Sequence, residues 1–259
     1  MRLLVVSAAA FALAPVAVLI WLSFAADPVV TVPPSGYTLR WYRQAIETPT
    51  FLYAFATSLK VALAATVLGV AAGTLASIAL VRIPFRGRAL LRSVFLSPIA
   101  VPGIVLSTGI YLFYIQVERL GAYDLTDGLS GLVLAHCALT IPWSVRLVGA
   151  VLVGIDRSVE EAAASLGATP LTTFRRVTLP LMRGGIVAAT LISCIVSFEN
   201  LEVSLLLAGP GRSTLPIALM QYLEFRMDPT AAAVCALQIL AIVGLLLLAD
   251  RAVGLGRIV

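Results

Sequence analysis

Residues 158–180 read Ser-Val-Glu-Glu-Ala-Ala-Ala-Ser-Leu-Gly-Ala-Thr-Pro-Leu-Thr-Thr-Phe-Arg-Arg-Val-Thr-Leu-Pro, a long polar segment between two strongly apolar stretches. Ser158 followed three residues later by Glu161 has the spacing of a capping box, in which each side chain bonds the other residue's backbone N–H. This pattern predicts a short Ala-rich helix over Val159–Leu166. Gly167 comes directly after it and is placed to end the helix in the left-handed conformation.

A second short helix is predicted directly after this glycine. Thr169 can cap it, and Pro170 suits its first position, where a missing N–H costs nothing. Leu179-Pro180 should end it, because a proline removes a helical hydrogen bond and restricts the residue before it. An ordinary cytoplasmic loop with two well-capped helices would show the same signals, so local physics alone leaves the role of the segment open.

The composition places the chain among the polytopic membrane proteins. Of its 259 residues, 60% are hydrophobic and only 12% are charged, which does not suit a soluble domain. The net charge of +5 is not a sign of nucleic-acid binding. The basic residues are almost all Arg and mostly flank apolar runs, so they report membrane topology instead.

Cysteine and histidine give no sign of a metal or redox site. Cys137, Cys194 and Cys235 all fall inside apolar runs without metal-ligand spacing, and are expected to be buried small hydrophobic residues. His136 is the only histidine in the chain. Alone in a membrane span, it is expected to be packed or hydrogen-bonded rather than to act as a ligand.

Six apolar runs predict an all-α protein with six transmembrane helices. Each run is long enough to cross the hydrocarbon core at about 1.5 Å per residue. Arg clusters at 82–92 and 157–183, with Arg251 and Arg257, would then all lie on the cytoplasmic side, as would both termini. The predicted spans are Leu3–Phe24, Ser58–Val81, Val94–Ile115, Gly131–Val153, Gly184–Ala208 and Ala231–Leu248.

The first run has two interpretations. Ala25 and Ala26 follow it, as at the cleavage site of a signal peptide, but its length favours a retained first helix. The polar segment 27–57 comes next and is expected outside the membrane. Its aromatic pair Trp41-Tyr42 is expected in an amphipathic helix at the membrane interface.

Two of the runs carry internal signals. Gly69 and Gly73 give the second run the small residues of a tight helix–helix face. Pro98 and Pro102-Gly103 break the first half of the third run. Such breaks persist in a membrane only where neighbours or a cavity satisfy the freed backbone groups, so either packing or a pathway explains them.

Two acids lie in the middle of the fifth predicted span. Glu199 and Glu202 are separated by three positions, with Asn200 between them, which predicts that both acids share one helix face. Ionisable groups at that depth are costly unless they face a cavity or a partner. A substrate pathway for a cation is one explanation. The alternatives are a carboxylate bonded to a neighbouring helix or an Arg, or one kept protonated.

The polar segment resembles a known family motif. Glu161-Ala162-Ala163, three residues, Gly167, nine residues and Val177-x-Leu179-Pro180 resemble the EAA loop of binding-protein-dependent ABC transporter permeases. Every spacing agrees with the family pattern, and Val177 in place of Ile is the one departure. In that family the loop is a coupling helix that docks into a groove on a separate ATPase subunit.

Other segments resemble the spermidine/putrescine branch of the same family, so the resemblance extends over essentially the whole chain. They are 97–106, 197–200, 209–216 and 228–233. Glu199 stands where that branch usually has Asp, and Asn200 where an acid is common. These departures leave the substrate open, and relatives in the branch carry iron or phosphonate compounds.

The resemblance implies a type I ABC importer permease fold in the bacterial inner membrane. It implies three kinds of protein partner: ATPase subunits that bind ATP and Mg, a second permease subunit and an external substrate-binding protein. Membrane lipid is the remaining partner, with no nucleic acid and no cofactor in this chain. Residues 1–56 would hold the first helix and the external segment, 57–249 the core with its coupling loop 156–182, and 250–259 a cytoplasmic tail.

No enzyme signature accompanies these features. Lys60 is the only lysine and no glycine precedes it, so the Gly-Lys-[Ser/Thr] of a Walker A phosphate loop is absent from the sequence. The rival hypotheses are a secondary carrier, proton-coupled through Glu199 and Glu202, and a structural membrane scaffold. The carrier would leave the 158–180 pattern unexplained, and the scaffold would leave the buried acids and the broken third run unexplained.

Overall fold

The computed structural model describes residues 1–259 except 30, 122–124, 210 and 254–259, so Asp124, Arg257 and most of the predicted tail lie outside the described residues. The described chain is helical, with one isolated bridge between Ala25 and Tyr37. The helices are α1 (Arg2–Leu22), α2 (Arg40–Glu47), α3 (Pro49–Arg82), α4 (Arg88–Ala100), α5 (Gly103–Arg119), α6 (Leu129–Gly154), α7 (Arg157–Ser165), α8 (Pro170–Thr173), the π-helical turn η1 (Phe174–Thr178), α9 (Leu179–Phe198), α10 (Glu202–Leu207), α11 (Leu215–Phe225) and α12 (Thr230–Val253).

The expected membrane-spanning helices are present, but one of them is strongly bent. Among the described residues, five continuous helices are long and apolar enough to cross a membrane: α1, α3, α6, the continuous stretch from α8 to α9, and α12. The third predicted span is divided into α4 and α5, whose axes differ by 111°. Val101 and Pro102 leave the helical conformation at the break predicted from Pro98 and Pro102-Gly103, and counting the bent pair as one span gives the six spans expected.

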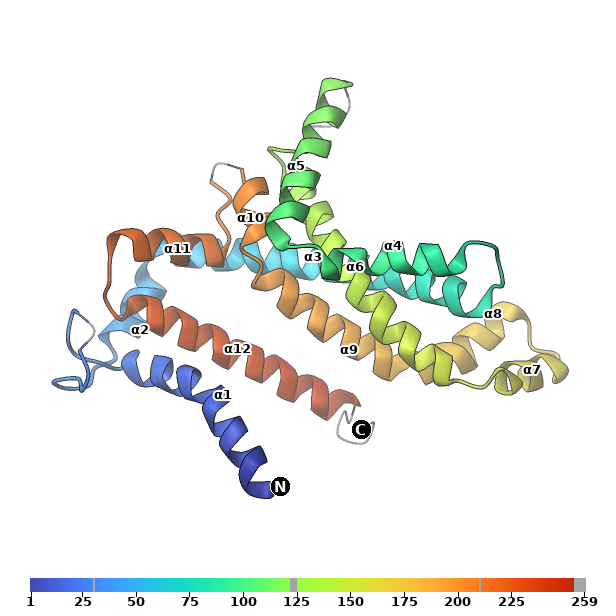
Figure 1. Cartoon of the computed structure of the whole chain (residues 1–259), viewed down its shortest axis with the longest axis horizontal. Helices are drawn as coiled ribbons and strands as arrows, with labels where there is room; N and C mark the ends of the chain where they lie inside the picture. The colour runs from blue at the N-terminus through green and yellow to red at the C-terminus, as the bar shows by residue number, and fades with distance from the viewer. Residues whose placement is uncertain (30, 122–124, 210, 254–259) are drawn as a thin grey trace.

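The centre of the fold is a tight bundle of α3, α6 and α9 (Figure 1). A side chain at Gly69 would overlap the Thr140 hydroxyl of α6, and a Cβ at Gly73 would lie 2.5 Å from the Ser144 Cβ. The two helices come close enough for Thr140 Oγ1 to donate to the Ala65 carbonyl oxygen at 3.0 Å. The small-residue face predicted for the second span is therefore the α3–α6 interface.

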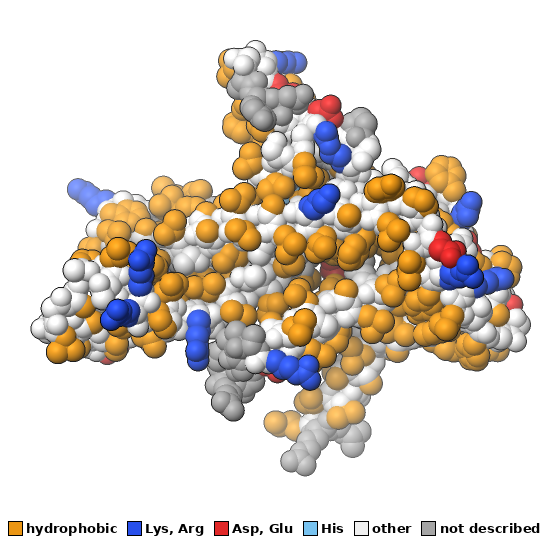
Figure 2. Space-filling model, turned by 180° about the vertical axis from the view of Figure 1, so that it is seen from behind, with side chains coloured by type: hydrophobic (Ala, Val, Ile, Leu, Met, Phe, Trp, Pro, Cys, Tyr) orange, Lys and Arg blue, Asp and Glu red, His pale blue; other side chains and the backbone are white. Residues whose placement is uncertain are grey.

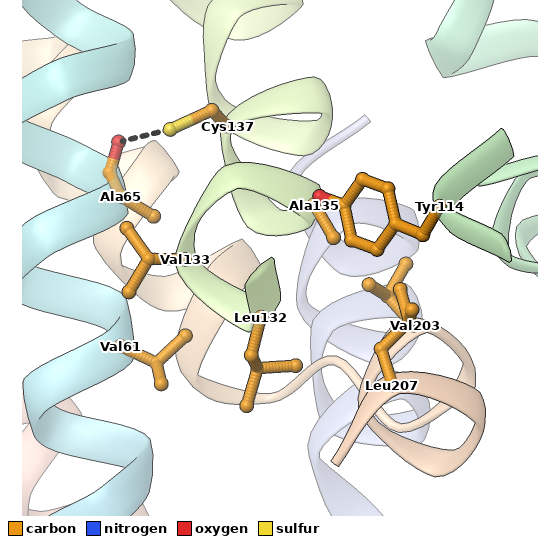
Figure 3. Close-up of a cluster of buried hydrophobic side chains, with 9 residues drawn as sticks. All are labelled: Val61, Ala65, Tyr114, Leu132, Val133, Ala135, Cys137, Val203 and Leu207. Atoms are coloured by element: carbon orange, nitrogen blue, oxygen red, sulfur yellow. Dashed lines mark hydrogen bonds between the residues drawn. The ribbon is translucent and has the colours of Figure 1, made fainter. Parts of the chain in front are cut away.

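A cluster of buried apolar side chains fills the space between α3, α5, α6 and α10 (Figure 3). Tyr114 of α5 joins this cluster, and its hydroxyl donates to the Gly131 carbonyl oxygen of α6 at 2.9 Å. The cluster consists of Val61, Ala65, Tyr114, Leu132, Val133, Ala135, Cys137, Val203 and Leu207. It anchors both α5 and α10 to the central bundle, although α5 itself projects away from it (Figure 1).

The remaining helices lie around this bundle. α1 packs against α12 and buries little else, and α7 and α8 lie at the end of α3 opposite to α2 and α11 (Figure 1). Trp41 of α2 is buried and donates from Nε1 to the Ala25 carbonyl oxygen at 2.6 Å. Apolar side chains cover most of the face in Figure 2, and charged ones are few and lie mainly near its edges, as a membrane surface requires.

The close α3–α6 contact makes position 69 sensitive to size. We expect Gly69→Ala to lower the stability of the detergent-solubilised protein by about 1–3 kcal/mol, the usual cost of overpacking. Gly244→Ala on α12 is the matched control, because a Cβ there meets nothing within 4 Å. Thermal unfolding measured by tryptophan fluorescence tests this, and equal midpoints for both variants would contradict the close contact.

Candidate functional site

The first helix of the polar segment 158–180 begins two residues earlier than its sequence predicts. α7 starts at Arg157, and its cap is Asp156, whose Oδ1 accepts from the Ser158 N–H at 2.9 Å. The capping box of Ser158 and Glu161 is therefore wrong, because the acid two residues before Ser158 takes the cap position. Hydrogen bonds from the Ser158 backbone and side chain lower the pKa of the Asp156 carboxyl below its usual value.

The glycine turn and the second cap are confirmed. Gly167 has a φ of +85°, and the Ala168 N–H reaches back to the Ala163 carbonyl oxygen at 3.1 Å. Thr169 Oγ1 accepts from the Thr172 N–H at 3.3 Å, with Pro170 in the first helical turn. A Cβ at Gly167 would meet nothing within 4 Å, so glycine is needed there for its backbone conformation rather than for space.

The second helix does not end at Leu179-Pro180. It continues from α8 through η1 into α9, and the Leu179 N–H bonds to the Phe174 carbonyl oxygen, five residues back. A proline in a regular helix loses a bond and clashes with the carbonyl four residues before it. A π turn directly before Pro180 changes this register, so the helix passes the proline without a break.

Glu160, which the sequence reasoning did not single out, attaches α7 to the membrane helices. Its carboxylate lies 3.2 Å from the Arg82 guanidinium at the end of α3 and accepts from Thr178 Oγ1 of η1 at 2.9 Å. Arg82 also donates to the Ile155 carbonyl oxygen at 3.1 Å, and Arg157 donates to the Arg82 carbonyl oxygen. These bonds join residues up to 78 positions apart, so no local pattern could have indicated them.

Much of the surface of α7 is open to solvent. Glu161 and Ala162 are exposed and Ala163 is half-buried. Leu166, directly after the last residue of α7, is 89% exposed. A cavity of about 480 Å³ lies between α7, α8, η1 and the end of α3, and both Glu160 and Glu161 line it.

The second candidate region is a break in the fifth predicted span. α9 ends at Phe198 and α10 starts at Glu202, so Glu199 and Glu202 do not share a helix face as expected. Asn200 caps α10: its Oδ1 accepts from the Val203 N–H at 2.8 Å, and its Nδ2 donates to Glu202 Oε2 at 3.2 Å. Both acids are exposed on the surface of this chain.

The breaks in the third and fifth spans meet. A Cβ at Gly103, the first residue of α5, would lie 3.1 Å from the Glu202 carboxyl carbon. The structure therefore places two interrupted helices and an acidic side chain together. His136 of α6 is buried beside the second break, with Nδ1 2.8 Å from Ser197 Oγ, which confirms the expectation that it is hydrogen-bonded.

The remaining residues considered from the sequence carry no site. Cys137 is buried, and Cys194 and Cys235 are half-buried and unpaired, in agreement with their apolar runs. Within the described residues, no group of three or more His, Cys, Asp or Glu side chains is arranged to hold a metal ion.

The chain is similar to known transport proteins over most of its length. It is 29% identical to the putrescine transport system permease protein PotI of Escherichia coli K12, covering 91% of this chain and 83% of that protein. It is 31% identical to the trehalose transport system permease protein SugB of Mycobacterium tuberculosis, covering 82% of this chain and 77% of that one.

The fold also has counterparts among solved structures. The crystal structure of a bacterial ABC transporter for import of the acidic polysaccharide alginate contains a chain that superposes with a TM-score of 0.68 at 18% identity, over 96% of this chain and 94% of that one. The family model of the binding-protein-dependent transport system inner membrane component matches residues 65–255. This match includes the glycine turn, the continuous helix and the broken fifth span, and the chain belongs to that family of inner membrane permease subunits.

Proposed function

We propose that this chain is the permease subunit through which an ATP-driven importer moves a small cationic, polyamine-like solute across the inner membrane. The observation that carries the substrate class is the pair of exposed carboxylates, Glu199 and Glu202, where two interrupted spans meet. Carboxylates at that depth are costly in lipid and are expected to face water and a substrate. Two negative charges suit a solute that carries positive charge.

The relatives support this substrate without deciding it. The putrescine permease covers more of this chain than the trehalose permease does, but the identities are close, so an uncharged sugar is the second candidate. Iron and phosphonate compounds, which the sequence resemblance left open, are further candidates with no observation in their favour here. The proton-coupled carrier leaves the coupling loop unexplained, and family membership favours ATP-driven import instead.

The proposed partners follow from the same family. A separate ATPase would bind ATP and Mg, so this chain would need no cofactor of its own and would not be an enzyme. An external binding protein would deliver the solute, and a second permease subunit, identical or different, would complete the pathway. Both termini would be cytoplasmic, on the side of α7, with α2 and α11 outside.

The coupling loop would supply a docking surface for the ATPase and a connection to the membrane helices. We assign docking to the exposed surface of α7 and the turn after it, with Glu161, Ala162, Ala163 and Leu166, and the left-handed turn at Gly167 fixes the end of this surface. Movement of α7 would be transmitted through Glu160, which contacts Arg82 of α3 and Thr178 of η1. Leu179 and Pro180 would continue it into α9, because the helix runs through them without a break.

The first prediction concerns docking. Gly167→Ala places a side chain in a left-handed conformation, which costs about 1–2 kcal/mol, so co-purification of the ATPase should weaken about tenfold, and Gly167→Arg should abolish it. Gly121→Ala and Gly121→Arg are the matched controls, because Gly121 has a φ of +75° and equally open surroundings but lies at the other membrane face. Equal ATPase recovery from all four variants would exclude docking at this loop.

The second prediction separates docking from transmission. Glu160→Gln removes the charge that faces Arg82, so the ATPase should still co-purify while transport falls about tenfold, within the usual range of coupling energies. Glu161→Gln removes an exposed charge from α7 and should weaken co-purification, with transport falling in proportion to the ATPase lost. Both are measured on the complete transporter in proteoliposomes. Unchanged transport in Glu160→Gln would show that α7 acts by another route.

The third prediction tests the substrate. In cells that express the complete transporter, uptake of labelled putrescine should exceed that of trehalose, and Glu199→Gln and Glu202→Gln should each reduce it about tenfold, as for a lost bond to a charged group. Glu224→Gln, which removes an exposed acid on α11, should leave uptake unchanged. Trehalose uptake that is insensitive to both variants would favour the sugar.

A further inference from the structure

One histidine connects the two sides of the break in the fifth span. His136 of α6 is 1% exposed, with Nδ1 2.8 Å from Ser197 Oγ and Nε2 3.2 Å from Ser204 Oγ. Ser197 lies in the last turn of α9, and Ser204 lies in the first turn of α10. A single rigid ring therefore spans the break, and both serines are buried with it.

A second hydrogen bond of Ser204 fixes the direction of its contact with the ring. The Ser204 hydroxyl donates to the Asn200 carbonyl oxygen at 2.8 Å, so its oxygen is left to accept from His136 Nε2–H. In a neutral ring that carries its proton on Nε2, Nδ1 accepts from the Ser197 hydroxyl. Every polar atom of the bridge has one role, and an apolar side chain at 136 would leave both serines with one bond fewer.

The bridge controls the segment that carries the acids. The break frees backbone groups that lipid cannot satisfy, and the Ser204 hydroxyl and the Asn200 side chain satisfy two of them. Because Ser204 holds Asn200 and His136 holds Ser204, the ring also sets where residues 199–202 lie. Glu202 at the end of this segment lies against Gly103, where the other interrupted span restarts.

We propose that His136 is a positioning residue, which sets the offset between α9 and α10 and thereby presents Glu199 and Glu202 at the junction with α5. Its value for transport rests on the proposed role of these two acids. The position of α10 relative to α5 can be measured whether or not these acids bind the substrate. The positioning role of His136 and the substrate role of the acids can therefore be tested separately. A histidine that only fills the core would leave this position unchanged when replaced.

The test is a disulfide across the junction. A Cβ at position 103 would lie 3.4 Å from that of Glu202, close to the separation of about 3.5–4.5 Å in disulfides. We would therefore make Gly103→Cys with Glu202→Cys in the full chain, after replacing Cys137, Cys194 and Cys235. Mild oxidation in membranes should cross-link the pair, and the initial rate reports where α10 lies.

His136→Leu should slow this cross-linking about fivefold or more, the factor for one lost hydrogen bond, and His136→Gln, with one donor and one acceptor, should restore part of the rate. Ser197→Ala and Ser204→Ala each cut one side of the bridge and carry the test if His136→Leu does not fold. Ser144→Ala is the control, because it removes another buried bond of α6, to the Val70 carbonyl oxygen. An unchanged rate in His136→Leu, or in both serine variants, would overturn the proposal.

Transport is then measured in the same His136 variants with the native residues at 103 and 202. Slower cross-linking together with a raised KM for putrescine would support positioning and the acidic pathway together. Slower cross-linking with unchanged uptake would retain the bridge but exclude the proposed role of Glu199 and Glu202. The failure of each proposal is thus seen in a different measurement.

Discussion

In the hydrocarbon core of a membrane, each backbone N–H and carbonyl needs a partner from the protein, because lipid offers none. Unbroken helices meet this condition by themselves, and α3, whose one proline is at its first residue, does so over its length. The interrupted fifth span meets it with side chains: Asn200 accepts from the Val203 N–H, and Ser204 donates to the Asn200 carbonyl oxygen. These polar side chains are the reason that a break can exist beside a packed bundle.

The need for backbone hydrogen bonds in the membrane also explains how the coupling loop and the acidic break are connected. The helix from Pro170 to Phe198 is continuous for 29 residues, which corresponds to about 44 Å at 1.5 Å per residue. The glycine turn lies before its first residue, and the acidic break follows its last. A regular helix would have been interrupted at Pro180, but the π turn keeps it continuous. A displacement of α7, held to η1 through Glu160, would therefore reach the break along one rigid element.

Features set by neighbours in sequence could be predicted, and features set by distant neighbours could not. Gly167 and Thr169 act within one turn of helix, so their roles were readable, as were the apolar runs. The cap at Asp156 was missed because Ser158 offered an equally good local pattern. The separation of Glu199 from Glu202 and the contact of Glu160 with Arg82 depend on helices that lie far apart in the sequence, which one sequence without its fold cannot reveal.

The surface of this chain exposes apolar side chains and charged side chains, and the two need different surroundings. None of the residues of α4 is buried, and its exposed apolar side chains can pack against lipid or against another apolar helix. Exposed carboxylates at Glu199 and Glu202 cannot do so, since lipid gives them neither charge nor hydrogen bonds. Water or a polar partner must cover that face, and a second permease subunit set opposite would enclose such a space. On the role proposed for these acids, the junction of α5 and α10 would be the side of the chain that faces the pathway.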